Sequence, residues 1–451
     1  MRDLLHSVAD RAATYLETQD ERGVAPSEAA IQRLSELDEA LPDAPTAPEK
    51  VLAMLDEIGS PATVTTSGRR FFGFVIGGSV PAALAANWMA GVWDQNAGLR
   101  VASPIAAKTE DVALAWLLDL LKLPSTAAGA FVTGATMANF TALAAARHAV
   151  LSKAGWDVES DGLFGAPNIH VVVGEEAHPT LFRSLSLLGL GHQRVTKVAV
   201  DEQGRMRADA LPKLSGPTIV CTQAGNVNSG GFDPIGEIVQ KAHEAGAWVH
   251  VDGAFGLWAS ATPNRAHLTK GVGEADSWAT DAHKWLNVPY DSGLAFVRDP
   301  EALRAALRLT AAYLPQSDIR EPSQFTPELS RRARGVEVWA ALRSMGRSGM
   351  ADLIERNCRY ATRFADGLQA AGYTILNAVV LNQVVVTFGD AEMNKRVIAG
   401  IQEDGTCWCG PTVWRGQSAM RISVSSWATT EADVEQSLAA ILRVAAGVKV
   451  H

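Results

Sequence analysis

Seven short apolar runs, separated by stretches long enough for helices, dominate the middle of the chain and constrain its fold more than any other feature. The runs are 130–133, 169–173, 195–200, 218–222, 248–252, 277–280 and 294–297. Apolar runs of this length, alternating with helix-length segments, favour crossover units in which parallel strands are buried by helices on both faces. The sequence therefore predicts an α/β fold with a mostly parallel central sheet covered by helices.

The chain on either side of this region has a different pattern. A length of 451 residues exceeds the usual size of one compact domain, so we expect several parts. Residues 1–60 have helical spacing and predict an N-terminal helical segment, residues 61–312 a large domain, and residues 313–451 a loop followed by a small α+β domain. Outside the central region we expect helices at 105–123, 336–345, 350–371 and 431–444, and strands at 384–388 and 420–424.

The overall composition excludes several classes of function. The chain is 47% hydrophobic and 20% charged, as in soluble globular proteins, and its net charge is -9. A negative chain has no electrostatic attraction for phosphate backbones or anionic lipids, so we expect neither nucleic-acid nor membrane partners. The sequence has no run of roughly 18 apolar residues and no signal-peptide core, which favours a cytoplasmic location. Four cysteines cannot form a disulfide framework in so long a chain, and Cys407 and Cys409 lack a second pair at zinc-site spacing, so no metal is expected.

Lys284 is the first candidate for catalysis, because it lies between apolar neighbours in the run 280–286. Burial disfavours the charged form of lysine, and a neutral amine can condense with an aldehyde to give a Schiff base. The simpler alternative is a lysine whose ammonium reaches solvent along an apolar surface. Upstream, a predicted strand ends in Asp252, at the kind of strand end where open α/β sheets bind ligands. A Schiff-base lysine and an acidic partner for a pyridine nitrogen together indicate pyridoxal 5′-phosphate.

Three further features lie at the ends of predicted strands. Gly134 and Thr136 mark a glycine turn at a helix start, where backbone amides converge on a phosphate; the alternative is a simple glycine turn capped by Thr136. His178 follows the second predicted strand, and its ring either stacks on a flat cofactor and orients a substrate carboxylate or belongs to an ordinary loop. His283, beside Lys284, is a candidate donor to the phosphate.

In chain order, these residues resemble the group II pyridoxal-phosphate-dependent amino-acid decarboxylases, the family that includes the aromatic amino-acid and glutamate decarboxylases. The similarity extends from about residue 71 to the end of the chain. It implies fold type I, with an aspartate aminotransferase-like large domain, and a homodimer whose active site lies near the interface. The cofactor-binding residues implied by the resemblance are Gly134, Ala135, Thr136, His178, Asp252, Ala254, His283 and Lys284.

The resemblance also implies a role for each catalytic candidate. His178 falls on the histidine that stacks on the cofactor ring, Asp252 on the aspartate at the pyridine nitrogen, and Lys284 on the Schiff-base lysine. Ala135, Thr136 and His283 fall on phosphate contacts. The implied reaction is decarboxylation of an L-amino acid to the amine, and a member that has kept only cofactor binding or dimerisation is the alternative from another class.

The loop before the small domain leaves the product open. Residues 327–334 resemble the basic segment that follows the mobile loop of the family, and many animal and plant members carry a proton-donating tyrosine in that loop. The stretch 316–326 contains Phe325 and no tyrosine. Relatives with phenylalanine at that position tend toward oxygen-dependent aldehyde formation. His178 and Lys284 are then the candidate proton donors, and an aldehyde synthase, another carbon–carbon lyase or a transaminase on the same scaffold is the alternative activity.

The candidate substrate residues lie outside the central region. Phe72 and Phe74 resemble the aromatic segment that lines the side-chain pocket of the family and favour an aromatic or bulky apolar substrate; the alternative is that they pack in the core. Arg421 falls where fold type I transaminases bind a substrate carboxylate, a task that suits a bidentate guanidinium, or else it is structural.

Overall fold

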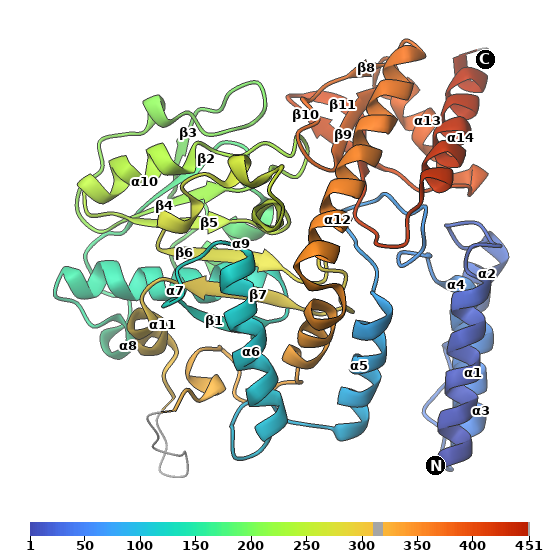
Figure 1. Cartoon of the computed structure of the whole chain (residues 1–451), viewed down its shortest axis with the longest axis horizontal. Coiled ribbons are helices and arrows are strands. Elements are labelled where there is room, and N and C mark those ends of the chain that lie inside the picture. The colour runs from blue at the N-terminus through green and yellow to red at the C-terminus, as the bar shows by residue number, and fades with distance from the viewer. Residues whose placement is uncertain (310–318, 450–451) are drawn as a thin grey trace. The chain divides into compact units, whose positions relative to one another are not determined.

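The computed structural model describes residues 1–309 and 319–449, which form two compact units (Figure 1). Unit 1 consists of Met1–Ile76, Thr362–Leu376 and Val384–His451, and unit 2 of Gly77–Ala361 and Asn377–Gln383. Each compact unit therefore contains segments that are distant in sequence. The division at residues 60 and 312, which follows chain order, stays a prediction. In the described part of the chain, no helix is both long and apolar enough to cross a membrane.

Unit 2 contains a seven-stranded sheet in the order β1-β7-β6-β5-β4-β2-β3. The strands are β1 (Ala128–Val132), β2 (His170–Gly174), β3 (Thr196–Val198), β4 (Thr218–Gln223), β5 (Trp248–Asp252), β6 (Ser277–Asp281) and β7 (Gly293–Val297). Strand β7 is antiparallel to both of its neighbours, whereas the other pairs are parallel. All seven predicted strands are present, which confirms the mostly parallel sheet expected from the apolar runs.

Helices surround this sheet and connect its strands. The α-helices that lie in unit 2 or begin there are α5 (Pro81–Trp93), α6 (Pro104–Leu120), α7 (Ala135–Lys153), α8 (Val158–Asp161), α9 (Pro179–Leu187), α10 (Ile235–Glu244), α11 (Pro300–Leu307) and α12 (Gly335–Ala370). Short 3-10 turns are η3 (Ala208–Ala210), η4 (Gly256–Ala261), η5 (Ala266–Thr269), η6 (Val272–Glu274) and η7 (Pro322–Gln324). Helix α12 is broken at Gly346, which has φ 61°, so the two helices expected there are confirmed as two segments.

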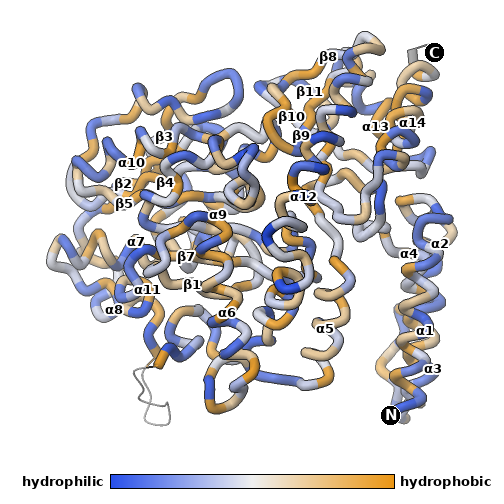
Figure 2. The backbone as a smooth tube through the Cα atoms, in the orientation of Figure 1, coloured by the Kyte–Doolittle hydropathy of each residue, from blue (hydrophilic) through white to orange (hydrophobic). Residues whose placement is uncertain are grey.

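The core of unit 2 is built on both faces of the sheet. Every residue of β5, β6 and β7 is buried, and because successive strand residues point to opposite faces, both faces must be covered. Helix α7 packs on one face through small side chains such as Ala138, Ala142 and Ala145, which let it approach the strands closely. The apolar strands and the mixed helices can be followed in Figure 2.

Unit 1 combines the N-terminal helices with a small sheet. The helical segments are α1 (Arg2–Thr18), α2 (Glu28–Arg33), η1 (Leu34–Leu37), α3 (Pro48–Met54), the π-helical turn η2 (Leu55–Gly59), α4 (Ser60–Ala62), α13 (Ala391–Asp404) and α14 (Glu431–Lys449). The sheet has the order β10-β11-β9-β8, with β8 (Thr374–Ile375), β9 (Gln383–Thr387), β10 (Gly410–Trp414) and β11 (Gln417–Ser423). The predicted strands at 384–388 and 420–424 and the terminal helix are confirmed, whereas β8 and β10 were not predicted.

A contact between two glycines connects the turn after β1 to the start of β7. Gly293 pairs with Val132 on one side and with Asp281 on the other. A Cβ atom built on Gly293 would lie 2.5 Å from the Cα of Gly134. No side chain fits in this space, so the backbone of the β1–α7 turn rests directly against β7.

Gly293→Ala should therefore lower the free energy of unfolding by about 1–3 kcal/mol, as is typical when a group is forced into a packed site. Denaturant unfolding of the purified protein measures the change. Gly447→Ala is the matched control, because Gly447 lies in α14 with open space around its Cβ position. The control should be neutral or up to about 1 kcal/mol more stable, since alanine favours helix. Equal stability of the two variants would contradict the backbone contact.

Candidate functional site

The predicted site residues of unit 2 gather where the parallel strands end. Gly134 follows β1, His178 follows β2, Asp252 ends β5 and Asp281 ends β6. Because the carboxyl ends of parallel strands meet at one edge of a sheet, side chains that are far apart in sequence come together there. This edge is the place where open α/β sheets bind ligands.

His178 and Asp252 line the same small cavity. The Nδ1 atom of His178 accepts a hydrogen bond from the backbone N–H of Thr180 at 3.3 Å, so the imidazole caps α9 and its ring is held in place. Asp252 is 4% exposed, and its carboxylate accepts hydrogen bonds from the Ala254 N–H at 3.2 Å and from Asn139 Nδ2 at 3.1 Å. These two donors fix the orientation of the carboxylate. The cavity thus presents an oriented aromatic ring and a fixed acceptor.

Lys284 forms an ion pair with a residue that the sequence did not point to. Its Nζ atom lies 2.8 Å from Oδ2 of Asp281, and the two side chains are 22% and 2% exposed. The ammonium of Lys284 is therefore ion-paired and its side chain largely withdrawn from solvent, and its catalytic role stays a prediction. The other oxygen of Asp281, Oδ1, is buried and accepts no hydrogen bond from the described residues. A buried carboxylate oxygen without a hydrogen bond can accept one from a donor that enters the site.

His283 lies beside this pair. The backbone N–H of Ser292 donates to Nδ1 at 3.0 Å, so the proton of the neutral ring is on Nε2, which lies 3.5 Å from Asp281 Oδ1. Burial lowers the pKa of His283, although the charge of Asp281 acts in the opposite direction. Tyr290 stacks on the imidazole with 4.3 Å between ring centroids, and burial raises the pKa of this tyrosine to about 12. His283 is thus a neutral donor, held by a backbone amide and an aromatic ring.

The start of α7 lies next to His283. Gly134 is the N-cap of this helix, and no side chain, that of Thr136 included, caps the helix start. A phosphate role for this turn stays a prediction. A Cβ on Gly134 would lie 3.2 Å from Cε1 of His283, which shows how closely the turn approaches the ring. The first amides of a helix lack partners within the helix and favour anions. The amides at Ala135 and Thr136 and the Nε2–H of His283 therefore form an arrangement suited to a phosphate.

The three predicted substrate residues all belong to unit 1. Phe72 is buried and makes an edge contact with Phe364 at 5.1 Å, which is core packing. Phe74 is 63% exposed and stacks on Trp408 at 5.5 Å. Arg421 donates to the Phe74 carbonyl at 3.1 Å, and burial lowers its pKa to about 10. A substrate role for these residues stays a prediction.

The segment before α12 is only partly a surface loop. Residues 315–318 of the expected loop lie outside the described residues. Phe325 is buried in the core of unit 2, and the guanidinium of Arg320 lies 4.9 Å from its ring centroid. In the basic segment that follows, Arg331 is buried and pairs with Glu110 on α6. Phenylalanine has no acidic proton to donate, so the proton donor must be another residue.

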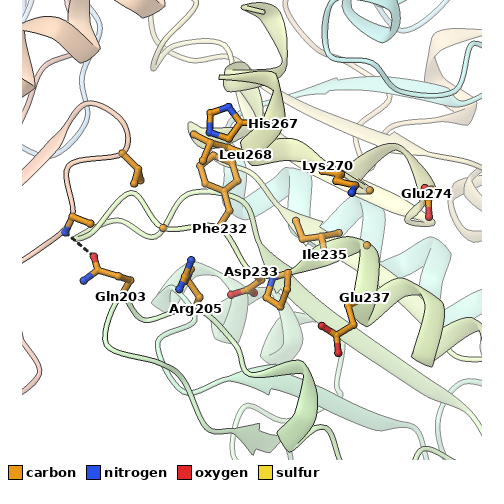
Figure 3. Close-up of a pocket in the computed structure, with 16 residues that line it drawn as sticks. Gln203, Arg205, Phe232, Asp233, Ile235, Glu237, His267, Leu268, Lys270 and Glu274 are labelled. Carbon is orange, nitrogen blue, oxygen red and sulfur yellow. Dashed lines mark hydrogen bonds between the residues drawn. The ribbon is translucent and has the colours of Figure 1, made fainter. Parts of the chain in front are cut away.

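A larger pocket of unit 2, with a volume of about 680 Å³, contains none of the predicted residues (Figure 3). Charged side chains of both signs line it, including Arg205, Lys270, Glu237 and Glu274. Its buried Asp233 accepts hydrogen bonds from two backbone amides, and burial raises the pKa of this carboxyl to about 6. These contacts show that Asp233 supports the end of β4. The lining charges are of both signs and do not indicate a particular class of ligand.

Comparison with known proteins identifies the family of the chain. Residues 31–388 match the pyridoxal-dependent decarboxylase conserved domain. The chain is 26% identical to an aromatic-L-amino-acid decarboxylase of Bacillus atrophaeus, over 88% of this chain and 85% of the relative. It is 27% identical to a phenylacetaldehyde synthase of Petunia hybrida, over 73% and 69% of the two chains.

Among solved structures, the chain is similar to the crystal structure of Oryza sativa TDC with PLP and tryptamine. The TM-score is 0.92 at 23% identity, covering 99% of this chain and 97% of that chain. This likeness shows the fold. The match to the conserved domain covers most of the sequence and confirms the expectation of an enzyme that decarboxylates amino acids with pyridoxal phosphate: the chain belongs to the pyridoxal-dependent decarboxylase family.

Proposed function

We propose that this protein decarboxylates an L-amino acid with an aromatic or bulky apolar side chain, releasing the amine, and that Lys284 holds the cofactor covalently. The observation that carries the assignment of the lysine is its 2.8 Å contact with Asp281, at the same sheet edge as the cavity of His178 and Asp252. The names of the relatives support the substrate class, since one is an aromatic-L-amino-acid decarboxylase.

The residues present fit pyridoxal 5′-phosphate. The amine of Lys284 is the group that an aldehyde requires, and the buried carboxylate of Asp252 is suited to a protonated pyridine nitrogen. The ring of His178 lines the same cavity and can cover a flat heterocycle. The helix start at Gly134 and the Nε2–H of His283 suit the phosphate. When bound, the cofactor supplies an electron sink for the bond that breaks at the substrate α-carbon.

The residues of the chain then have distinct tasks. Asp252 holds a proton at the ring nitrogen, and His178 orients the carboxylate of the substrate. Lys284 would hold the cofactor, and Asp281, whose Oδ2 lies 2.8 Å from Nζ, would position the amine whenever it is free. Lys284 is our assigned donor of the proton to the α-carbon, because the stretch 316–326 has no tyrosine and its Phe325 is buried.

We also infer that the chain works as a homodimer, on the evidence of α5. This helix has no charged residue, and among its side chains only Ala83 is buried. Trp88, Met89, Val92 and Trp93 are exposed. A helix without charges that exposes several large apolar side chains needs a cover, because large exposed apolar patches mark interaction sites. A second copy of the chain is the cover that the family resemblance implies, and a cytoplasmic location stays a prediction from composition.

Incubation of the holoenzyme with each standard amino acid tests the function. Carbon dioxide and the amine should form in equal amounts without oxygen uptake, with kcat/KM for aromatic substrates at least about tenfold above that for glutamate, a difference of about 1.4 kcal/mol. Lys284→Ala should lose activity and should not become labelled when borohydride reduces the covalent link. Lys270→Ala, in the other pocket, should be labelled normally.

Aldehyde and peroxide in place of the amine would show that the protein is the alternative aldehyde synthase. Amino transfer to a keto acid without gas release would indicate a transaminase. Labelling of a lysine other than Lys284 would overturn the assignment of the cofactor lysine.

The ion pair between Asp281 and Lys284 should be visible in the stability of the cofactor-free protein. Asp281→Asn and Lys284→Met, made singly and together, form a double-mutant cycle. We expect a coupling free energy of about 1–2 kcal/mol, because both groups are largely withdrawn from water. Denaturant unfolding measures it. Additive effects of the two substitutions would show that the contact contributes nothing to stability.

Val92→Glu should disrupt the dimer, since it places a charge on the apolar face of α5. The dissociation constant from analytical ultracentrifugation should rise at least about tenfold. Val413→Glu is the matched control, because Val413 is 66% exposed and Val92 69%. A dimer unaffected by Val92→Glu, or a protein that is monomeric before substitution, would contradict the assignment of this face.

A further inference from the structure

A buried line of four side chains leads away from the carboxylate of Asp252. Asn139 Nδ2 lies 3.1 Å from Asp252 Oδ2, and Asn139 Oδ1 lies 2.8 Å from His250 Nε2. His250 Nδ1 lies 2.9 Å from the hydroxyl oxygen of Ser277, which in turn lies 2.9 Å from Nε1 of Trp248. We call this line, from Trp248 through Ser277, His250 and Asn139 to Asp252, the carboxylate relay. Asn139, His250 and Ser277 are completely buried.

The fold explains why these residues meet. Trp248, His250 and Asp252 alternate along β5, so their side chains point to the same face of the sheet. Ser277 on β6 is the direct partner of His250 in the parallel register. Asn139 comes from the second turn of α7, which packs on that face. Three elements therefore build the relay, and Asn139 is separated from the rest by more than a hundred residues of sequence.

The hydrogen bonds of the relay have only one consistent direction. An ionised carboxylate accepts only, so the Asn139 amide must turn its N–H toward Asp252 and its oxygen toward His250. His250 must then donate from Nε2 and accept at Nδ1 from the Ser277 hydroxyl, whose oxygen accepts the indole N–H of Trp248. Burial lowers the pKa of His250 to about 3, so its ring is neutral at physiological pH and carries one proton. Every donor in the line points toward Asp252.

We propose that Asn139 and His250 are positioning residues that hold the carboxylate of Asp252 in place, and thereby set how firmly it holds a proton on the ring nitrogen of the cofactor. This inference rests on the proposed role of Asp252. Hydrogen bonds in a chain polarise one another in a medium of low dielectric, so donors that all point one way stabilise the anion at the end of the line. If these hydrogen bonds served only to pair buried polar groups, they would stabilise the fold and would not affect the protonation of the ring nitrogen.

The test uses the holoenzyme loaded with pyridoxal phosphate that carries ¹⁵N in its ring, and NMR reports whether that nitrogen is protonated. Asn139→Leu removes the donor to Asp252 at nearly constant volume. We expect the ring-nitrogen signal to move toward the unprotonated position, and kcat to fall about 10–100-fold with KM changed less than about threefold, as when a partner that orients a ligand group is lost. Ser277→Ala, one link farther from Asp252 than His250, should give a smaller shift in the same direction.

Asn394→Leu is the matched control, because Asn394 is also completely buried and hydrogen-bonded but lies in unit 1. It should lower stability and leave the ring-nitrogen signal unchanged. An unchanged signal in Asn139→Leu would overturn the proposal. Should that variant fail to fold or to bind the cofactor, an unchanged signal in Ser277→Ala would overturn it instead.

Asp252→Ala separates this proposal from the proposed function. If the signal moves in Asp252→Ala but not in the relay variants, the relay alone is wrong. If the signal stays in place in Asp252→Ala as well, Asp252 is not the partner of the ring nitrogen, and its proposed role fails together with the relay.

Discussion

The parallel pairing of β5 with β6 is the constraint on which the candidate site depends. It aligns Asp252 with Ala279, so that the last residues of both strands reach the same edge of the sheet. Asp252 and Asp281 consequently stand at neighbouring strand ends, and Lys284 follows β6 closely enough to turn back to Asp281. A shift of one residue in either strand would turn these side chains to the opposite face. The register is thus as much a part of the site as its side chains are.

The two buried carboxylates at this edge are stabilised in different ways. Asp252 accepts hydrogen bonds from neutral donors, an amide side chain and a backbone N–H. Asp281 pairs with the ammonium of Lys284 and keeps one oxygen without a hydrogen bond among the described residues. Because the donors to Asp252 are neutral, its negative charge can still pair with a positive group of a ligand. The charge of Asp281 is already paired with the ammonium of Lys284 until the lysine reacts. Such a separation of environments is how one site supports two acids with different tasks.

The sequence predicted the sheet well because its strands are buried on both faces and appear as continuous apolar runs. It did not predict β10, whose residues are exposed or partly buried except for Trp414 and include Pro411, so no apolar run marks it. Lys284, Asp252 and His178 could be singled out as candidates because each lies at or soon after the end of a predicted strand. Asp281 also ends a strand, but beside a lysine it resembles an ordinary surface charge. Asn139 and His250 carried no signal, since their pairing exists only once α7 lies on the sheet.

The junction of Gly134 and Gly293 involves main chain only, and this has a consequence for how the protein can vary. Contacts between side chains loosen or tighten whenever a neighbour changes its rotamer, whereas two backbones in direct contact offer nothing to rotate. Substitutions in the surrounding core can therefore alter volumes and shapes while this junction keeps the turn between β1 and α7 in place. Substitutions intended to change specificity are therefore best made away from this junction, at residues whose replacement does not move the main chain.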